Sequence, residues 1–450
     1  MQFLLLFLGF AFTSGAFLPL RLRNRSLQLN RLRSNIRSVR LRHGALYQFD
    51  GDQCSRGWLS SNSSRTPFGA VQPVFTIDNA EYLVPVSVGT GTSTELQLVL
   101  DTGSGDLWIP DHDCEYFPSP QLQTSNDGDD VCPSYCRLSR FCATFCEKEC
   151  CPLGIVGAAE RCADDAFRTA DSSTFKLIDS TTHRLDYQSI TVFAKYAKDH
   201  FQFGLEDPFS VGELEFGLAM KITDNTATTQ GGYQHGGILG LALFTGFPEP
   251  AKPAVSQVFH NAQFEHPTFH IYLNYGDEEC DGGKIEYGTA EPNFDLCEHE
   301  GIALSFVRTY SLCVHPIVFI DGSSPSDLGY HSVPALVDSG SNVIFGPRAV
   351  VETLAREVGA VQDPQTRGLY RIPCGTDGLK DIVFTVFNEG KELRVSPANY
   401  VIKSDVDDDD CIFGFATIDA RRWILGTPFM RQYCSSFDTD QRVMTFRKRL

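Results

Sequence analysis

After its first residues the sequence lacks any apolar run long enough to span a membrane, so it predicts no membrane anchor. Residues 3–12 form one almost wholly apolar run, which is too short to cross a bilayer. Small residues at positions 14–16 follow this run, and they predict that residues 1–16 are a secretory signal peptide. A buried helix is the alternative interpretation, since no Lys or Arg precedes the run.

Acidic residues are absent before Asp50 and lysine is absent before Lys148, whereas ten arginines lie within residues 17–67. From Phe68 onward, 28 Lys and Arg oppose 54 Asp and Glu. A basic arm before an acidic body predicts an intramolecular electrostatic partner. A disordered tail and a nucleic-acid-binding patch are the alternatives. The preceding signal peptide and the lack of interleaved aromatic residues argue against nucleic acid.

Length and composition predict an ordinary globular protein that enters an oxidising compartment. The chain has 450 residues, 42% hydrophobic and 21% charged, which is enough for two domains with a full core. Its 15 cysteines indicate disulfide formation. Asn24 and Asn62 lie in glycan-acceptor sequences, in or near the basic arm.

Eight of the cysteines lie in an unusual segment, residues 111–167. The spacings Cys132-x3-Cys136 and Cys146-x3-Cys150 are compatible with a metal site. The secretory context and the even number of cysteines favour an insert held together by disulfides and without metal. Eight cysteines allow 105 pairings, so the sequence does not give the connectivity. The insert either gates a site, binds a partner or is a passive surface insertion.

Two short stretches have the same pattern. Asp101 follows Val99-Leu100 and begins Asp-Thr-Gly-Ser, and Asp338 follows Leu336-Val337 and begins Asp-Ser-Gly-Ser. One such tetrapeptide is usually a plain turn. Two copies with the same apolar flanks indicate a duplicated unit with a site at its pseudo-twofold axis.

A pair of aspartates in this arrangement is suited to peptide hydrolysis. Two carboxyl groups within hydrogen-bond reach share one proton, and their apparent pKa values separate. The ionised carboxylate can take a proton from water while the protonated one polarises the scissile carbonyl. This chemistry requires no metal, no cofactor and no nucleophilic side chain.

At these residues the sequence resembles the pepsin-like aspartic proteases. Further matches in the same order extend the resemblance over most of the chain: Tyr82–Thr90, Ser172–Phe175, Gly237–Ala242, Ser256-Gln257, Asp381–Thr385, Trp423–Gly426 and Phe429–Tyr433. The resemblance implies a mostly β, bilobal fold, in which two pseudo-twofold-related lobes enclose a cleft. Residues 68–268 are then the amino-terminal lobe with the insert at 111–167, and residues 269–450 are the carboxyl-terminal lobe.

The resemblance also implies an activity. The protein is expected to be an aspartic endopeptidase that cleaves polypeptides at acidic pH, and to be made as a zymogen. Residues 17–67 are expected to be its basic pro-segment and intramolecular inhibitor. The expected location is outside the cell or in a lysosome-like compartment, and the expected state is a monomer without a membrane anchor.

The resemblance assigns roles to individual residues. Asp101 and Asp338 are the expected catalytic pair. Tyr187 is the candidate tyrosine of the flap, the hairpin that closes over substrate, although the glycines usual there are missing and an ordinary strand residue is the alternative. Cys374 and Cys411 resemble the carboxyl-terminal disulfide of the family. The expected supporting residues of the pair are Thr102, Gly103, Ser104, Ser339, Gly340 and Ser341.

Because the flap differs from the family pattern, a second function stays open: a weak or inactive secreted binding protein on the same fold. Thr427 occupies a place where the family often has an aspartate, which leaves the partner of Arg431 open. His270 and His315 stand in apolar surroundings and are predicted to be packed strand residues.

Several local elements are predicted from periodicity. Val71 to Pro110 is rich in strand patterns, and Phe269 to Leu273 alternates like a strand. Arg348 to Val358 has helical spacing that Gly359 ends, and a short helix is expected within residues 245–263.

Overall fold

The computed structural model of the chain describes residues 69–77, 81–117, 160–163, 166–187, 190–204, 208–224, 236–248, 250–275, 282–306, 309–320, 333–363, 368–386, 390–402, 410–418 and 420–450. The predicted signal peptide and pro-segment, residues 1–67, lie outside these ranges, as do Asn24 and Asn62. Six of the eight cysteines of the insert also lie outside them.

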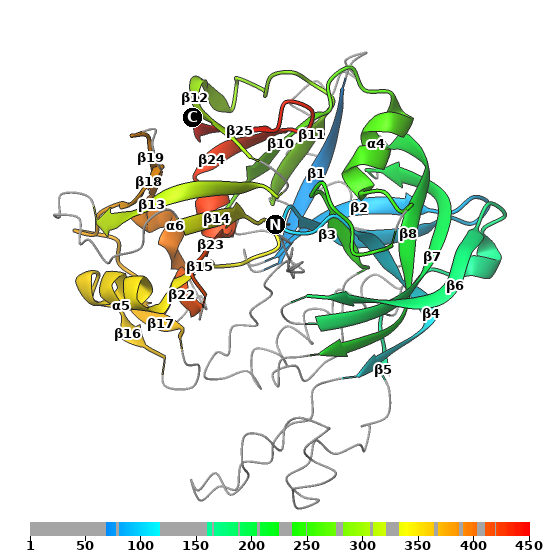
Figure 1. The fold of residues 1–450 in the computed structure, drawn as a ribbon, viewed down its shortest axis with the longest axis horizontal. Coiled ribbons are helices and arrows are strands. Elements are labelled where there is room, and N and C mark those ends of the chain that lie inside the picture. Colours follow the sequence, from blue (N-terminus) through cyan, green and yellow to red (C-terminus); the bar gives the residue numbers. More distant parts are fainter. Residues whose placement is uncertain are drawn as a thin grey trace, which may run out of the picture.

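The fold consists of two β lobes joined by a shared sheet, with the amino-terminal lobe on the right of Figure 1 and the carboxyl-terminal lobe on the left. The amino-terminal lobe contains β1 (Ala70–Ile77), β2 (Glu81–Val88), β3 (Thr94–Asp101), β4 (Leu107–Phe117), β5 (Glu160–Arg161), β6 (Lys176–Asp186), β7 (Ile190–Phe203), β8 (Phe209–Asp224), β9 (Ile238–Gly240), the short η2 (Thr169–Asp171) and α4 (Ala254–Ala262).

The joining strands are β10 (Thr268–Leu273), β11 (Gly283–Tyr287), β12 (Cys297–Ser305), β24 (Tyr433–Asp438) and β25 (Val443–Arg449). They extend the sheet of the amino-terminal lobe in the order β12-β25-β24-β10-β11-β1-β2-β3-β9-β4-β8-β7-β6. Segments far apart in the chain therefore pair directly in this sheet: β1 with β11, and β10 with β24, both antiparallel.

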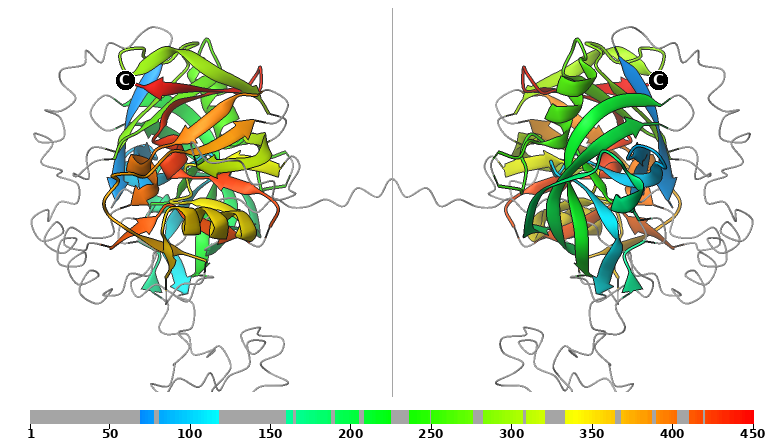
Figure 2. Two further views of the ribbon diagram at one scale, coloured as in Figure 1. Left: turned by 90° about the vertical axis from the view of Figure 1, so that its left-hand side faces the viewer. Right: turned by 90° about the vertical axis from the view of Figure 1, so that its right-hand side faces the viewer.

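The carboxyl-terminal lobe has two smaller sheets. One runs in the order β19-β18-β13-β14-β23-β15-β22, and the other in the order β16-β17-β21-β20. Helix α5 lies on the outer face of this lobe, toward the viewer in the left view of Figure 2. The elements are β13 (Ser311–Ile320), β14 (Val333–Val337), β15 (Ile344–Pro347), α5 (Arg348–Glu357), β16 (Val361–Gln362), β17 (Tyr370–Pro373), β18 (Ile382–Val386), β19 (Glu392–Val395), α6 (Pro397–Tyr400), β20 (Val401–Ile402), β21 (Asp410–Phe413), β22 (Phe415–Ile418), β23 (Trp423–Leu425) and α7 (Thr427–Met430).

The predicted local elements are present. Strands β1 to β4 occupy the segment that was predicted to be strand-rich, and α4 is the short helix expected within residues 245–263. Helix α5 buries Val350, Val351 and Leu354, and Gly359 beyond it has a φ of 75°, which ends the helix without steric strain.

Strand β10 differs in one respect from a half-buried strand, because all six of its residues are buried. Phe269, Ile271 and Leu273 enter the main hydrophobic cluster on one face. On the other face Tyr272 packs beside the Cys297–Cys434 disulfide. The segment that this disulfide anchors covers the second face of the sheet, which the alternation of residue types did not reveal.

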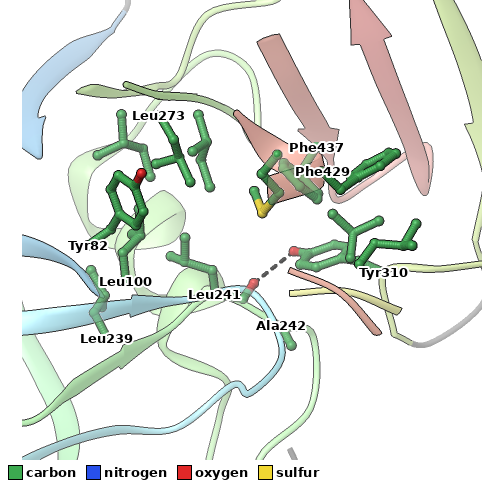
Figure 3. Close-up of a cluster of buried hydrophobic side chains, with 14 of the residues drawn as sticks. Tyr82, Leu100, Leu239, Leu241, Ala242, Leu273, Tyr310, Phe429 and Phe437 are labelled. Atoms are coloured by element: carbon green, nitrogen blue, oxygen red, sulfur yellow. Dashed lines mark hydrogen bonds between the residues drawn. The ribbon is translucent and has the colours of Figure 1, made fainter. Parts of the chain in front are cut away.

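The two lobes share one continuous hydrophobic cluster. It includes Leu100 and Leu241 of the amino-terminal lobe, Tyr310 of the carboxyl-terminal lobe and Phe437 of the joining sheet (Figure 3). Burial of apolar area on this scale is the main stabilising term for a fold of this kind. The relative position of the lobes is therefore part of the core packing.

The base of the cysteine-rich insert is an ordered structure. Strand β5 pairs with β4, with Glu115 opposite Arg161, and the Cys114–Cys162 disulfide closes the same base with a Cα–Cα distance of 5.4 Å. This disulfide agrees with the prediction that disulfides hold the insert together. The remaining six cysteines of the insert lie outside the described residues.

His270 is fully buried on β10, as a packed residue. Its Nε2 lies 3.0 Å from the Thr289 carbonyl and its Nδ1 lies 2.8 Å from the Ser436 hydroxyl. Burial lowers the pKa of His270 to about 4; the Thr289 carbonyl and Glu286 oppose this shift, and Arg447 adds to it. The side chain of His315 lies outside the described residues.

His270 should make the fold sensitive to acid. The unfolded chain binds a proton near the ordinary histidine pKa of about 6.5 and the folded chain only near 4, so stability falls as the pH drops through that window. The loss amounts to about 3 kcal/mol. We expect His270→Gln to remove this part of the pH dependence in urea unfolding measured at about pH 7 and pH 4. His260→Gln, at an exposed histidine, is the matched control. The assignment would be contradicted if the free energy of unfolding changed equally between pH 7 and pH 4 in both variants.

Candidate active site

The two repeated turns lie at the ends of equivalent strands. Asp101 ends β3, which pairs in parallel with β9, and Asp338 follows β14, which pairs in parallel with β23. Strands β9 and β23 belong to two of the stretches that carry the family resemblance, Gly237–Ala242 and Trp423–Gly426. Each aspartate therefore lies at the carboxyl end of a strand, and both side chains are fully buried.

Reciprocal hydrogen bonds join the two turns. The Thr102 amide donates to the Ser339 hydroxyl at 3.0 Å, and the Ser339 amide donates to the Thr102 hydroxyl at 3.0 Å. Each hydroxyl then donates to the strand of the opposite lobe, Thr102 to the Val337 carbonyl at 2.9 Å and Ser339 to the Leu100 carbonyl at 2.7 Å. This pseudo-twofold arrangement needs a small residue with a hydroxyl group at both positions.

Each carboxyl group is also held within its own turn. The Gly103 amide donates to Asp101 Oδ1 at 2.8 Å, and the Gly340 amide donates to Asp338 Oδ1 at 2.9 Å. The second oxygens accept from serine hydroxyls, Asp101 Oδ2 from Ser104 and Asp338 Oδ2 from Ser341, the latter at 2.8 Å. All six predicted supporting residues therefore lie at the pair.

Glycine is required where the turns meet. A Cβ atom on Gly103 would lie 2.5 Å from Asp338 Oδ1, and one on Gly340 would lie 2.8 Å from Asp101 Oδ1. Each glycine thus leaves room for the carboxylate of the opposite lobe.

The two carboxyl groups are electrostatically coupled. Burial, and next the negative charge of Asp338, raise the pKa of Asp101 well above the usual value, although the bonds from Ser104 and Gly103 oppose the shift. The carboxyl groups lie within hydrogen-bond reach of each other. Two acids this close cannot both ionise at little cost, so they hold one proton between them over a range of pH.

Comparison with known proteins agrees with this geometry. The model of the family described as eukaryotic aspartyl protease matches residues 81–448. The chain belongs to this family. It is accordingly an aspartic-type endopeptidase with the bilobal pepsin-like fold.

Named relatives cover nearly the whole length of the chain. Aspartic protease 10 of Caenorhabditis elegans is 26% identical over 420 residues, which cover 90% of this chain and 91% of the relative. Aspartic protease 2 of Necator americanus is 26% identical over 386 residues, 84% of this chain and 85% of its own. Pepsin A of Sus scrofa is 24% identical over 379 residues, 82% of this chain and 81% of its own.

Tyr187 lies at the end of a long hairpin in this aspartic protease. Strands β6 and β7 pair with Asp186 opposite Thr191, and the Tyr187 amide donates to the Ile190 carbonyl at 2.9 Å. Its ring is buried, and its hydroxyl accepts a hydrogen bond of 2.9 Å from Trp108 Nε1. Trp108 follows the Asp101 turn on β4, so the hairpin is tied to the same segment that carries the aspartate.

Asp106 is a further buried carboxyl group in the segment that carries Asp101, and it was not among the predicted site residues. The Thr245 hydroxyl donates to it at 2.5 Å and the Gly246 amide at 3.0 Å, and burial raises its pKa. The next residue, Phe247, packs against Tyr196 of β7 with ring centroids 5.0 Å apart. Asp106 therefore anchors a loop against which the hairpin packs.

Arg431, whose partner the sequence left open, donates hydrogen bonds from both terminal guanidinium nitrogens. Its Nη2 donates to the Asn399 carbonyl at 3.0 Å and its Nη1 to the Tyr82 hydroxyl at 3.5 Å. The Thr427 amide donates instead to the Ser341 carbonyl at 2.7 Å. Thr427 thus supports the Asp338 turn through its backbone.

Cys374 and Cys411 form the disulfide that the resemblance implied, with a Cα–Cα distance of 4.9 Å. The bridge lies beside β17 and β21, away from the aspartates. In the part of the chain that the structure describes, no helix is long and apolar enough to cross a membrane, and no cluster of three potential metal ligands occurs.

Proposed function

We propose that Asp101 and Asp338 are the catalytic pair of this endopeptidase and that it works at acidic pH. The observation that carries the proposal is the buried, coupled pair of carboxyl groups, with a raised pKa at Asp101. Between the two apparent pKa values of such a pair, one carboxyl group is protonated and the other is ionised. This is the state that acid–base catalysis requires.

In the proposed reaction the ionised carboxylate takes a proton from a water molecule, whose oxygen attacks the scissile carbonyl carbon. The protonated carboxyl group donates its proton to the carbonyl oxygen, which gives a tetrahedral diol. The carbon–nitrogen bond then breaks as the protonated carboxyl group gives its proton to the amine nitrogen. The ionised carboxylate takes a proton from a diol hydroxyl as the carbonyl re-forms, which leaves the pair with one shared proton. Ser104 and Ser341 orient the two carboxyl groups through their hydrogen bonds.

The direct test is cleavage of an unfolded protein by material freed of residues 17–67, from about pH 3 to pH 7. We expect cleavage in acid that a statine-type transition-state mimic blocks. Absence of cleavage at every pH, from protein shown to be folded, would favour the alternative of a binding protein on the same fold.

Tyr187 is proposed to close over the substrate from the flap. The bond from Trp108 supports this role, since it orients the ring beside the Asp101 segment. A neutral hydrogen bond contributes about 1 kcal/mol, so we expect Tyr187→Phe to lower kcat/KM by about 3- to 10-fold without a comparable loss of stability. Tyr287→Phe, which removes a buried hydroxyl bonded to Gln72 in the joining sheet, is the control. A loss no larger than that of the control would argue against a flap role.

Residues 17–67 are proposed to be an inhibitory pro-segment. The segment carries ten arginines, whereas the chain from Phe68 onward has 54 acidic and 28 basic residues, so the two parts have opposite net charge. Acid would protonate the carboxylates that hold the segment in place and so release it. The apolar run at residues 3–12 supports secretion or delivery to a lysosome-like compartment. The acceptor sequences at Asn24 and Asn62 support a glycoprotein. We also propose that the protein is a monomer.

A further inference from the structure

Tyr310 forms a hydrogen bond between the lobes at the back of the site. It immediately precedes β13 in the carboxyl-terminal lobe and is fully buried. Its hydroxyl donates to the carbonyl of Leu241 at 2.7 Å (Figure 3). Leu241 follows β9 in the amino-terminal lobe, so one side chain connects segments that are 69 residues apart.

Both ends of this bond continue to the aspartates. On one side the Leu241 amide donates to the carbonyl of Asp101 at 2.8 Å. On the other side the amide of Val337, the residue before Asp338, donates to the carbonyl of Tyr310 at 2.8 Å. A short series of hydrogen bonds therefore runs from Asp101 through Leu241 and Tyr310 to the amide of Val337, the residue before Asp338.

Tightly packed rings fix the position of Tyr310. Phe306 packs edge-on at 4.9 Å between ring centroids, and Phe437 lies at 4.8 Å. Burial raises the pKa of Tyr310 well above the ordinary value, so the hydroxyl stays a donor throughout the acidic range. The packed rings thus orient the hydroxyl, which can donate this bond across the acidic range.

The reciprocal bonds of Thr102 and Ser339 join the two turns directly, whereas the Tyr310 bond joins the strands and loops behind them. We propose that Tyr310 is a positioning residue for the catalytic pair: its hydroxyl fixes the register between the two lobes at the aspartates. This inference rests on the proposed function of Asp101 and Asp338. Tyr310 makes no contact with substrate in this role and acts through the peptide groups of the pair.

The test is Tyr310→Phe, which keeps the ring and removes the hydroxyl. A looser register weakens the coupling of the two carboxyl groups, so their apparent pKa values should approach each other. We expect the two limbs of the pH profile of kcat/KM to move inward, and kcat at the optimum to fall roughly 10-fold, with KM little changed. Titration with a tight-binding statine-type mimic counts folded sites, so partial unfolding does not imitate the effect.

Tyr400→Phe is the matched control. Tyr400 is also fully buried, and its hydroxyl also donates to a backbone carbonyl, that of Lys380 at 2.8 Å, within the carboxyl-terminal lobe. A merely structural role predicts similar losses of thermal stability in both variants. It also predicts that neither variant shifts the limbs of the pH profile of kcat/KM. That result, with active wild-type protein, would overturn this inference alone. Wild-type protein without activity would overturn the proposed function and the inference together.

Discussion

Asp101→Asn is expected to lower kcat/KM by about 10⁴-fold, the upper end of what one acid–base group contributes. A side-chain amide neither gives up a proton nor takes one from water in this pH range, so the substitution removes the acid–base function and keeps the shape. The measurement is cleavage of a peptide near the pH optimum, with folded sites counted independently. Asp106→Asn is the matched control, because Asp106 is also a buried carboxyl group of the same segment but holds a loop. We expect the control to retain activity within a few-fold.

The same variant has an expected signature in stability. A carboxyl group whose pKa is raised in the folded state destabilises that state progressively as the pH rises from the unfolded pKa through the folded one. Burial and the charge of Asp338 place Asp101 in this class. Asp101→Asn should therefore be at least as stable as the wild type at neutral pH. Retained peptidase activity would contradict the assignment. So would a variant that gains less stability over the wild type at neutral pH than at acidic pH.

Gly103→Ala is expected to abolish most of the activity by a different route. The added methyl group would lie 2.5 Å from Asp338 Oδ1 and 2.6 Å from its carboxyl carbon, so the opposite aspartate must move. A displacement near 1 Å at a reacting group costs on the order of 100-fold in rate. We expect a loss of at least this size in kcat, measured per folded site.

The control for this steric effect is Gly375→Ala. A Cβ atom there would have no neighbour within 4 Å, so the intrinsic change from glycine to alanine is tested without a clash. Unchanged kcat in Gly103→Ala, or equal losses in the two variants, would show that the approach of the turns does not govern catalysis.

The parts of the site that local sequence predicts are those with a repeated or periodic pattern. The repeated turns indicated a duplicated unit with a site at its pseudo-twofold axis, and the two aspartates lie at the ends of the equivalent strands β3 and β14. Helix α5 follows from its spacing and the glycine after it. The Cys374–Cys411 disulfide came from the resemblance alone, since spacing gives no pairing.

Other features depend on contacts between distant segments and have no local pattern. Tyr310 stands in an unremarkable Thr-Tyr-Ser sequence, and only the folded chain places its hydroxyl beside Leu241. Asp106 lies two residues beyond the Asp101–Ser104 motif, but an aspartate after a turn is ordinarily exposed, and its burial depends on the loop at Thr245. The second buried face of β10 likewise depends on the Cys297–Cys434 disulfide.

The central claim is that two coupled carboxyl groups perform the hydrolysis, and the pH profile of kcat/KM for the activated wild-type protein tests it most directly. The account predicts a bell-shaped profile with its optimum well below neutrality, because activity requires one protonated and one ionised member of the pair. Cleavage that rises steadily toward neutral pH, or no cleavage between about pH 2 and pH 8 by folded protein, would contradict it.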